Sequence, residues 1–317
     1  MLTRVGERVA AGLRSAASPW GPGYALARTL LAASTLATLA ASPTSSLFLP
    51  VADRPDYPVC DGVARFGLFC LASQHLDAGR VIAIALMVPV ILGFFPRVLG
   101  AVHWWIAYSF QANATMVDGG DQIAAILALL LLPATFTDPR WNHWAAERSG
   151  AERLPARLLA WSGHLAVRVQ VAIIYFHACV SKFRVPEWLD GTAIYYWSTD
   201  PHFGASGLVR TVLKPVVESK AVALIAWTVL AIELGLAIAI FMPAWGRRAM
   251  LWPGLLLHAG IAAVHGLLSF SLVMAAALLI HTGWRPARRP LTVEVTRGLA
   301  GWWRSRARLA RAGSETG

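Results

Sequence analysis

The chain has 317 residues, of which 56% are hydrophobic and only 14% are charged, against roughly 25% charged in an average soluble domain. This number of charged residues is too small to cover the surface of a soluble protein of this length. The composition therefore excludes an ordinary soluble domain. The net charge of +11 would suit a protein that binds nucleic acid. The basic residues instead follow a membrane pattern, described below, and we expect no nucleic-acid partner.

Hydrophobic residues gather in blocks of about 16 to 23, the length that a helix needs to cross a hydrocarbon core of roughly 30 Å. Backbone amides in lipid must be paired within their own segment, so these blocks predict helices. The predicted fold class is all-α: a polytopic integral membrane helix bundle with about eight transmembrane helices. In chain order, the predicted spans are 25–42, 80–95, 98–117, 120–136, 165–181, 221–243, 249–265 and 266–281.

The last two spans form one apolar block that is too long for a single crossing, and we place its turn at His265-Gly266. Basic residues then fall unevenly on the two sides of the membrane. Eighteen of the 28 Lys and Arg residues lie on the side of the two termini, and seven lie in the opposite long loops, 43–79 and 182–220. Because basic residues concentrate in cytoplasmic segments, both termini are predicted to be cytoplasmic.

This topology divides the chain into a basic N-terminal tail (1–24), a transmembrane domain (25–283) and a basic C-terminal tail (284–317). Within the last of these, the stretch 291–312 has two interpretations. It is either an amphipathic helix lying on the anionic inner leaflet or a solvated basic tail.

Three cysteines are distributed over the first long loop and the fifth span. Cys60 and Cys70 lie in the first outer loop, where an oxidising compartment favours a disulfide between them. The alternative is two free thiols, with Cys70 packed at the start of the next span. Cys179 lies within the fifth span and is interpreted as core packing.

The fifth span and its exit hold the densest group of polar residues. Helical spacing places Tyr175 and Cys179 on the same face as Lys182, and places His177 on a second stripe. A lysine at the outer edge of a span commonly extends toward the headgroups. A partly desolvated Lys182 would instead act as a base, with His177 as a secondary proton carrier.

Two further spans and one turn contain candidate site residues. Glu233 lies near the middle of its span, where an ionised carboxylate costs roughly 2.5–3.5 kcal/mol, so it must be paired, protonated or facing a cavity. It has either a functional role or a structural hydrogen bond. Asp118 and Asp121 either cap the helix that follows them or line an outward-facing cleft with Lys182.

His258 and His265 share a helical face but lie roughly 10 Å apart along the axis, too far for an obvious metal pair. No closely spaced histidine boxes occur elsewhere in the sequence. We therefore predict no metal site, and count His258 with Glu233 among the candidate catalytic residues.

Two runs together resemble a known family of membrane proteins. HWWIAYSFQANATMVDGGDQIAAILALLLLPATFTDPR (103–140) and QVAIIYFHACVSKFRVPEWLDGTAIYYW (170–197) are similar to signatures of the HTTM (horizontally transferred transmembrane) superfamily, which includes the vitamin K-dependent γ-glutamyl carboxylases. The similarity is greatest to the sporulation-delaying protein B (SdpB) branch. It extends to PTSSLF (43–48), PVCDGVARFGLFC (58–70) and HAGIAAVHGLLSFSLVM (258–274).

The resemblance implies a bacterial inner-membrane protein that aids the maturation or export of a secreted peptide. Its implied partners are the lipid bilayer, a secreted peptide precursor and a companion maturation protein. In the carboxylase branch a lysine at the place of Lys182 acts in base chemistry driven by a reduced quinone. The carboxylases also carry a histidine where this chain has Gly119-Gly120-Asp121, and a large lumenal domain that this chain lacks.

The leading hypothesis is therefore peptide maturation at an outward cleft formed by the 118–121 turn, Lys182 and the 183–203 loop. In this cleft Lys182 is the central basic group, with Asp118 and Asp121 as its charge partners. One alternative is a quinol-dependent, carboxylase-like membrane enzyme. Another is a non-catalytic scaffold or immunity-type protein, in which single polar substitutions have little effect. Whether the protein is an enzyme is left open by the sequence.

Overall fold

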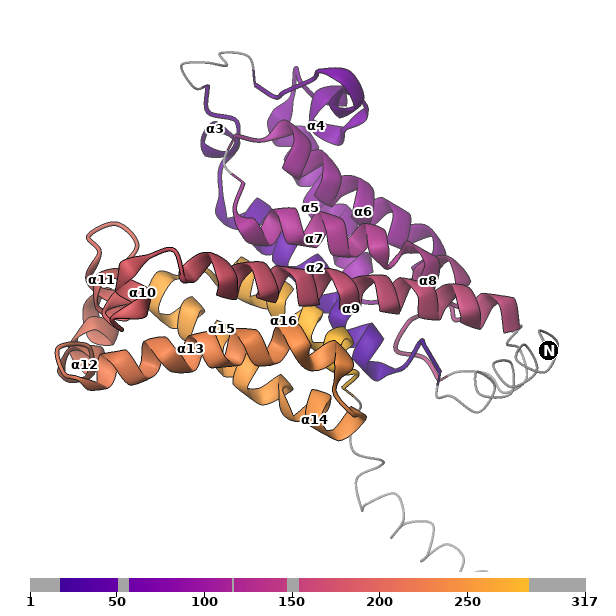
Figure 1. The fold of residues 1–317 in the computed structure, drawn as a ribbon. Coiled ribbons are helices and arrows are strands. Elements are labelled where there is room, and N and C mark those ends of the chain that lie inside the picture. Colours follow the sequence, from indigo (N-terminus) through magenta and orange to yellow (C-terminus); the bar gives the residue numbers. More distant parts are fainter. Residues whose placement is uncertain (1–17, 51–56, 116, 147–153, 285–317) are drawn as a thin grey trace, which may run out of the picture. The chain divides into compact units, whose positions relative to one another are not determined.

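The computed structural model describes residues 18–50, 57–115, 117–146 and 154–284 (Figure 1). These residues form helices joined by turns, with no β-sheet among them. The first half contains α2 (Pro22–Ala41), α3 (Thr44–Leu47), η1 (Gly62–Phe66), α4 (Leu68–Leu71), α5 (Leu76–Ile91), α6 (Pro96–Asn113), α7 (Gly119–Leu130) and α8 (Leu132–Thr137). The second half contains α9 (Leu154–Lys182), α10 (Pro186–Leu189), α11 (Ala193–Thr199), α12 (Gly207–Val217), α13 (Ala221–Ile238), η2 (Ala239–Phe241), α14 (Ala244–Ala249), α15 (Leu251–His265) and α16 (Leu268–Thr282).

The all-α prediction is confirmed. Among the described residues, three helical segments are long and apolar enough to cross a membrane: Pro22–Ala41, Leu154–Lys182 and Ala221–Phe241. Two further apolar helices, Gly119–Leu130 and Leu268–Thr282, are shorter. The predicted amphipathic stretch 291–312 lies outside the described residues, as does most of the N-terminal tail.

Most helix boundaries lie within about four residues of the predicted spans, and two differences are larger. Helix α9 already includes Leu154, well before the predicted start at residue 165. The predicted span 120–136 is two helices, because Pro133 has no N–H for the hydrogen bond that would continue α7 into α8.

The predicted turn at His265-Gly266 is confirmed. Helix α15 ends at His265, and Gly266 has φ 72° and ψ 7°, a left-handed conformation that glycine adopts without a side-chain clash. Helix α16 then begins at Leu268. The turn lets α15 and α16 lie against each other as an antiparallel pair.

Helices α2 and α16 form the most extensive pairing of the bundle, followed by α9 with α13 and α2 with α5. Small residues allow the closest approaches, as expected between helices in lipid. A Cβ atom at Gly23 would lie 2.6 Å from the carbonyl oxygen of Trp284. A Cβ atom at Gly254 would lie 2.8 Å from Leu278 of α16.

Hydrogen bonds near the helix ends show that these ends gather in two groups. We call the first group the Asp118 end. Its hydrogen bonds join Thr115 to Leu47 (2.8 Å), Ser269 to Asp118 (3.3 Å) and His265 to Phe203 (2.7 Å).

We call the second group the Trp20 end. Its hydrogen bonds join Trp20 to Ala134 (2.8 Å), Phe95 to Trp141 (2.7 Å) and Arg247 to Thr282 (3.3 Å).

Eight helical segments of the described chain run from one set of ends to the other. These are α2, α5, α6, α7 with α8, α9, α13 with η2, α15 and α16. Each successive segment runs in the opposite direction to the one before it. The two long loops predicted to lie on one side, 43–79 and 182–220, both join helices at the Asp118 end.

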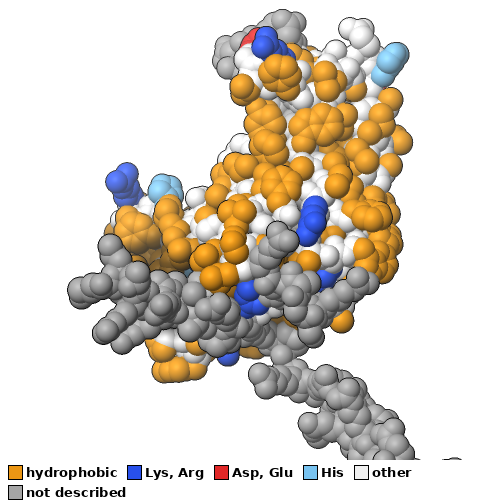
Figure 2. Space-filling view, turned by 90° about the vertical axis from the view of Figure 1, so that its right-hand side faces the viewer, with side chains coloured by type: hydrophobic (Ala, Val, Ile, Leu, Met, Phe, Trp, Pro, Cys, Tyr) orange, Lys and Arg blue, Asp and Glu red, His pale blue; other side chains and the backbone are white. Residues whose placement is uncertain are grey.

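The surface of the bundle is rich in exposed hydrophobic side chains. One face is covered mainly by such side chains, with only a few Lys and Arg residues between them (Figure 2). Across the whole bundle, large exposed side chains include Leu224, Phe241, Trp252 and Leu256, which are 66–88% exposed. Patches of this kind are rare on soluble monomers and are stable when lipid covers them.

Candidate functional site

The segment between α9 and α13 folds into three short helices, α10, α11 and α12, at the Asp118 end. Carboxylates cap its turns. Asp190 accepts hydrogen bonds from the backbone and hydroxyl of Thr192, and Asp200 accepts from the backbone N–H groups of His202 and Phe203. These hydrogen bonds lower the pKa of both carboxyls.

Helix α10 is held close to α13 by a glycine turn. Gly191 has φ +84°, and a Cβ atom there would lie 2.5 Å from the Cβ of Ala223 on α13. Only glycine permits both this backbone conformation and this approach. The turn brings buried Trp188 into a small apolar cluster with Cys179, Ala193, Ala226 and Leu230.

Lys182 is the last residue of α9, and its side chain turns back into the bundle. Its Nζ donates to the carbonyl oxygen of Ala178, one turn earlier, at 3.2 Å. The same Nζ lies 2.7 Å from Oε1 of Glu233 on α13 and 5.2 Å from the ring centre of Trp188. The Lys182 side chain therefore points back along α9, and Glu233 is its partner.

Glu233 offers one further acceptor in this site. The side chain of Glu233 is only 9% exposed and that of Lys182 is 21% exposed. Oε2 of Glu233 is buried and has no hydrogen-bond partner among the described residues. A buried carboxylate oxygen without a partner is costly, so a hydrogen-bond donor that reached this oxygen would be bound favourably.

A second buried polar contact lies on the same face of α9. The Tyr175 hydroxyl and Nε2 of His258, on α15, are 2.8 Å apart. The His258 ring packs edge-on against Phe270, and its backbone oxygen accepts a hydrogen bond from the Ser271 hydroxyl. Tyr175 and His258 therefore tie α9 to α15, while the ion pair ties α9 to α13.

The other candidate residues lie apart from this pair. His177 is on the exposed face of α9, which agrees with its predicted separate stripe. Asp118 and Asp121 form a capping box at the start of α7: each side chain accepts from the other's backbone N–H, at 2.8 and 3.3 Å. Both aspartates therefore cap α7, as one of the two interpretations predicted. Asp121 also accepts a hydrogen bond from Thr38, and Asp118 accepts one from Ser269, but neither aspartate contacts Lys182.

A cavity of about 520 Å³ lies beside these aspartates, between α2, α3 and the start of α16. Its lining includes the polar residues Thr38, Ser42, Asp118, Asp121 and Ser269. Neither Lys182 nor Glu233 lines this cavity. The structure therefore does not bring Lys182 and the two aspartates together in one cleft, as the sequence had predicted.

The loop between α3 and α5 is closed by a disulfide between Cys60 and Cys70, whose Cα atoms are 5.6 Å apart. The Asn113 amide donates to the carbonyl oxygens of Val59 and Ala64 within the same loop. The sequence predicted no individual role for Asn113, or for Trp188 within the 183–203 loop of the predicted cleft. The position of Asn113 near the end of a predicted span, and that of Trp188 soon after Lys182, could have indicated them.

Comparison with known proteins places this chain beside two proteins of Bacillus subtilis (strain 168). It is 36% identical to the protein YitO over 267 residues, which are 83% of this chain and 86% of YitO. It is 35% identical to sporulation-delaying protein SdpB over 280 residues, which are 87% of this chain and 85% of SdpB. No family model and no solved structure matches the sequence.

Proposed function

Because the chain belongs to the family of sporulation-delaying protein SdpB, we propose that it is a multi-pass protein of the bacterial inner membrane that aids the maturation or export of a secreted peptide. Its proposed partners are the peptide precursor and a companion maturation protein. The name of SdpB connects that relative with a sporulation-delaying activity, and near full-length similarity supports a related role for this chain.

The proposed topology has eight membrane crossings, with both termini in the cytoplasm. Two observations support it. The eight helical segments alternate between the Trp20 end and the Asp118 end, and the arginine-rich segments of the sequence connect to the Trp20 end. The Asp118 end, with α10, α11, α12 and the disulfide-closed loop, would then face outward. A disulfide at Cys60 and Cys70 fits an oxidising outer compartment.

The observation that carries the functional proposal is the ion pair of Lys182 and Glu233. An ion pair inside a membrane domain is expensive and commonly marks a functional site. This one lies under α10, at the outward end of α9, and it keeps one carboxylate oxygen without a partner. The arrangement can bind a donor group of a peptide backbone and transfer a proton between the amine and a carboxylate.

The direct test replaces Lys182 in the producing strain. Strains that have or lack the gene are compared by mass spectrometry of peptides in the medium, which identifies the peptides that depend on it. We expect Lys182→Ala to abolish those peptides while the protein stays in the membrane fraction at normal amount. Normal peptide production by this variant would remove Lys182 from the site.

Loss of a buried charge partner also destabilises proteins, so stability needs its own control. The double variant Lys182→Met/Glu233→Gln replaces both charges by neutral side chains of similar length, and this often restores stability. If the pair only holds α9 to α13, the double variant regains peptide production with its stability. We expect stability to return without peptide production.

The quinol-dependent alternative stays a prediction from the sequence resemblance. It would be tested by following the oxidation of a quinol by the purified protein with and without the Lys182 substitution. The scaffold alternative predicts that the strain with Lys182→Ala secretes normal amounts of peptide. The first experiment therefore also distinguishes the scaffold alternative from the proposed function.

A further inference from the structure

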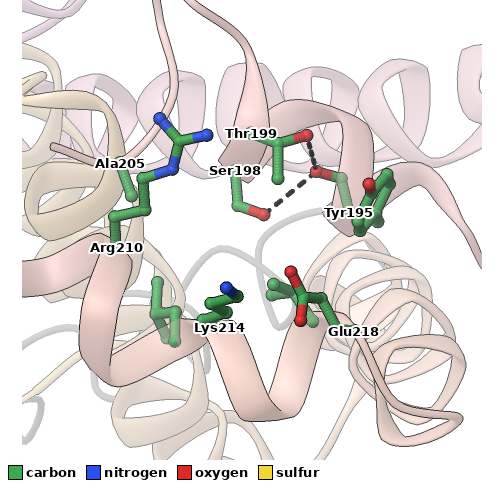
Figure 3. Close-up of a pocket in the computed structure, with 9 residues that line it drawn as sticks. Tyr195, Ser198, Thr199, Ala205, Arg210, Lys214 and Glu218 are labelled. Atoms are coloured by element: carbon green, nitrogen blue, oxygen red, sulfur yellow. Dashed lines mark hydrogen bonds between the residues drawn. The ribbon is translucent and has the colours of Figure 1, made fainter.

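A second polar site lies between α11 and α12, on the Asp118 end of the bundle. It is a pocket of about 200 Å³ lined by Tyr195, Ser198, Thr199, Arg210, Lys214 and Glu218, together with smaller apolar side chains (Figure 3). Arg210, Lys214 and Glu218 follow one another at intervals of four residues. One side of α12, together with the residue that ends it, Glu218, therefore presents all three to the pocket.

The charged side chains of this pocket have no partners within the described chain. Arg210, Lys214 and Glu218 form no ion pair and no side-chain hydrogen bond with any residue that the structure describes. The hydroxyls of Ser198 and Thr199 donate to the carbonyl oxygen of Tyr195, at 3.1 and 2.7 Å, and their own oxygens stay available as acceptors. The pocket thus offers two cations, one carboxylate and two hydroxyl oxygens.

The surroundings of the pocket are those of a membrane interface. Tyr196 and Trp197 of α11 are 58% and 51% exposed, and such aromatic side chains gather at the level of lipid headgroups. On α12, Leu208 and Val212 are 79% and 64% exposed, on roughly the opposite face from the two cations. A helix of this kind lies in the interface with its apolar face toward the acyl chains and its cations among the phosphates.

We propose that this pocket binds the headgroup of an aminophospholipid. The phosphate would lie between Arg210 and Lys214, since a guanidinium binds phosphate oxygens through paired hydrogen bonds. The primary amine would face Glu218 and the free hydroxyl oxygens. The volume of about 200 Å³ suits a headgroup rather than a drug-sized molecule, for which pockets of roughly 300–1,000 Å³ are usual.

Native mass spectrometry of the purified full-length protein tests this assignment. The protein is mixed in detergent with equal amounts of phosphatidylethanolamine, phosphatidylglycerol and phosphatidylcholine. We expect the wild type to retain phosphatidylethanolamine in preference to the other two. The double variant Arg210→Gln/Lys214→Gln should bind it about tenfold more weakly, a change of ~1.4 kcal/mol. Arg65→Gln, which removes an exposed cation far from the pocket in the sequence, is the matched control and should bind normally.

The carboxylate provides a separate readout. Glu218→Gln should keep lipid binding but lose the preference for phosphatidylethanolamine over phosphatidylglycerol, because only the amine distinguishes them here. Equal retention of phosphatidylethanolamine by the double variant and the wild type would overturn the proposal. Displacement of the lipid by millimolar inorganic phosphate would also overturn it, since the site would then be one for free phosphate. An unchanged elution volume for every variant shows that binding, not folding, was altered.

Discussion

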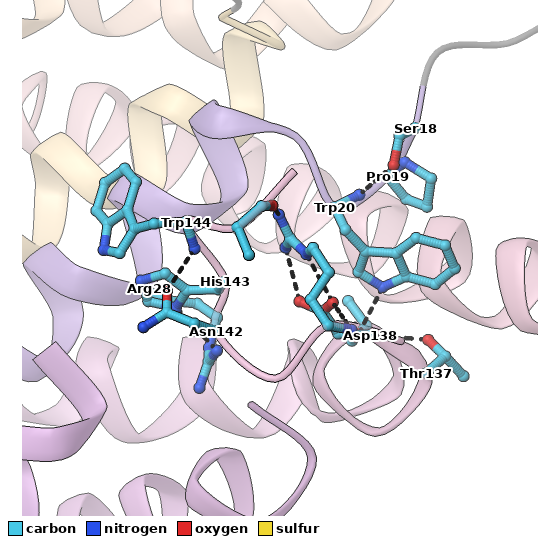
Figure 4. A network of polar contacts seen from close by, with 12 residues as sticks. Ser18, Pro19, Trp20, Arg28, Thr137, Asp138, Asn142, His143 and Trp144 are labelled. Atoms are coloured by element: carbon cyan, nitrogen blue, oxygen red, sulfur yellow. Dashed lines mark hydrogen bonds and ion pairs between the residues drawn. The ribbon is translucent and has the colours of Figure 1, made fainter. Parts of the chain in front are cut away.

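Two ion pairs occupy the two ends of the bundle, and they are built differently. At the Trp20 end, Asp138 binds Arg140 through both carboxylate oxygens, at 2.8 and 2.7 Å, and also accepts from the Arg140 backbone N–H (Figure 4). At the Asp118 end, Lys182 binds only one oxygen of Glu233. The first pair joins residues two apart, while the second joins two helices and leaves an acceptor open.

The surroundings of each pair extend this contrast. The neighbouring His143 contacts Arg28 (Figure 4). The Asp138 backbone oxygen also accepts from Arg97, and His143 contacts Thr29, so this region ties several helix ends together. The partly exposed Lys182 lies beneath one tryptophan instead. In the Asp138–Arg140 pair both carboxylate oxygens are bound, and such a pair rigidifies a fold. In the Lys182–Glu233 pair one carboxylate oxygen has no partner among the described residues. From this difference we expect Asp138 to matter mainly for stability and, under the function proposed above, Lys182 to matter mainly for peptide production.

The largest stability effect is therefore expected at Asp138. Asp138→Ala leaves the buried Arg140 guanidinium without its partner, and breaking such a pair costs about 3–5 kcal/mol. Thermal unfolding in detergent, followed by loss of the monodisperse elution peak, should show a lower midpoint. Asp138→Asn/Arg140→Gln, which removes both charges, should recover part of the loss. A midpoint that stays at the wild-type value would contradict the structural role.

Lys182→Met should lower stability less, by about 2 kcal/mol, because water reaches part of the Lys182 side chain and Glu233 already lacks one partner. The same unfolding assay compares the two variants directly. Peptide production should show the reverse order, with Lys182→Met lower than Asp138→Ala once both are scaled to the amount of folded protein. The same order in both assays would mean that the two ion pairs serve the same purpose.

The pH dependence of stability should come from the Trp20 end. Burial, followed by the charges of Arg28 and Arg140, lowers the pKa of His143 from 6.5 to about 3. The folded protein therefore disfavours a proton that the unfolded chain binds below pH 6.5. Stability from this residue is complete above pH 6.5 and falls as the pH drops toward 3, by about 1.4 kcal/mol per pH unit at most.

This loss is measurable as a falling unfolding midpoint between pH 6.5 and 5.5. His143→Gln, which cannot take up the proton, should be less stable at neutral pH but should show a flatter profile in this window. A profile as steep as that of the wild type would assign the pH dependence to other groups.

Local patterns in the sequence predicted much of this fold. Apolar block length identified the helices, and the 3.6-residue period correctly placed Tyr175 and Cys179 on the Lys182 face and His177 off it. The capping of α7 by Asp118 also follows from residues three apart. The break at Pro133 was missed because hydrophobicity continues across it, although the proline itself was the signal.

The partner of Lys182 could not be predicted from such patterns. Glu233 is 51 residues away in the sequence, and pairing depends on how α9 and α13 rotate and slide against each other. The pairing also depends on the turn at Gly191, which sets how closely α10 approaches α13. The sequence of α12 has an amphipathic period, but the long loop that contains it was not predicted to form helices.

The smallest expected effect concerns Tyr175, which shares a helix face with Lys182 but binds His258 instead. Tyr175→Phe removes only a hydroxyl and leaves Nε2 of His258 without its partner, so we expect a loss of about 1 kcal/mol in stability. Peptide production should stay near the wild-type level, because neither Tyr175 nor His258 hydrogen-bonds to the ion pair. Ser271→Ala, which removes a hydrogen bond to the His258 backbone, is the matched control of similar size. If Tyr175→Phe abolished peptide production while Ser271→Ala did not, the functional site would extend inward from Lys182 to His258.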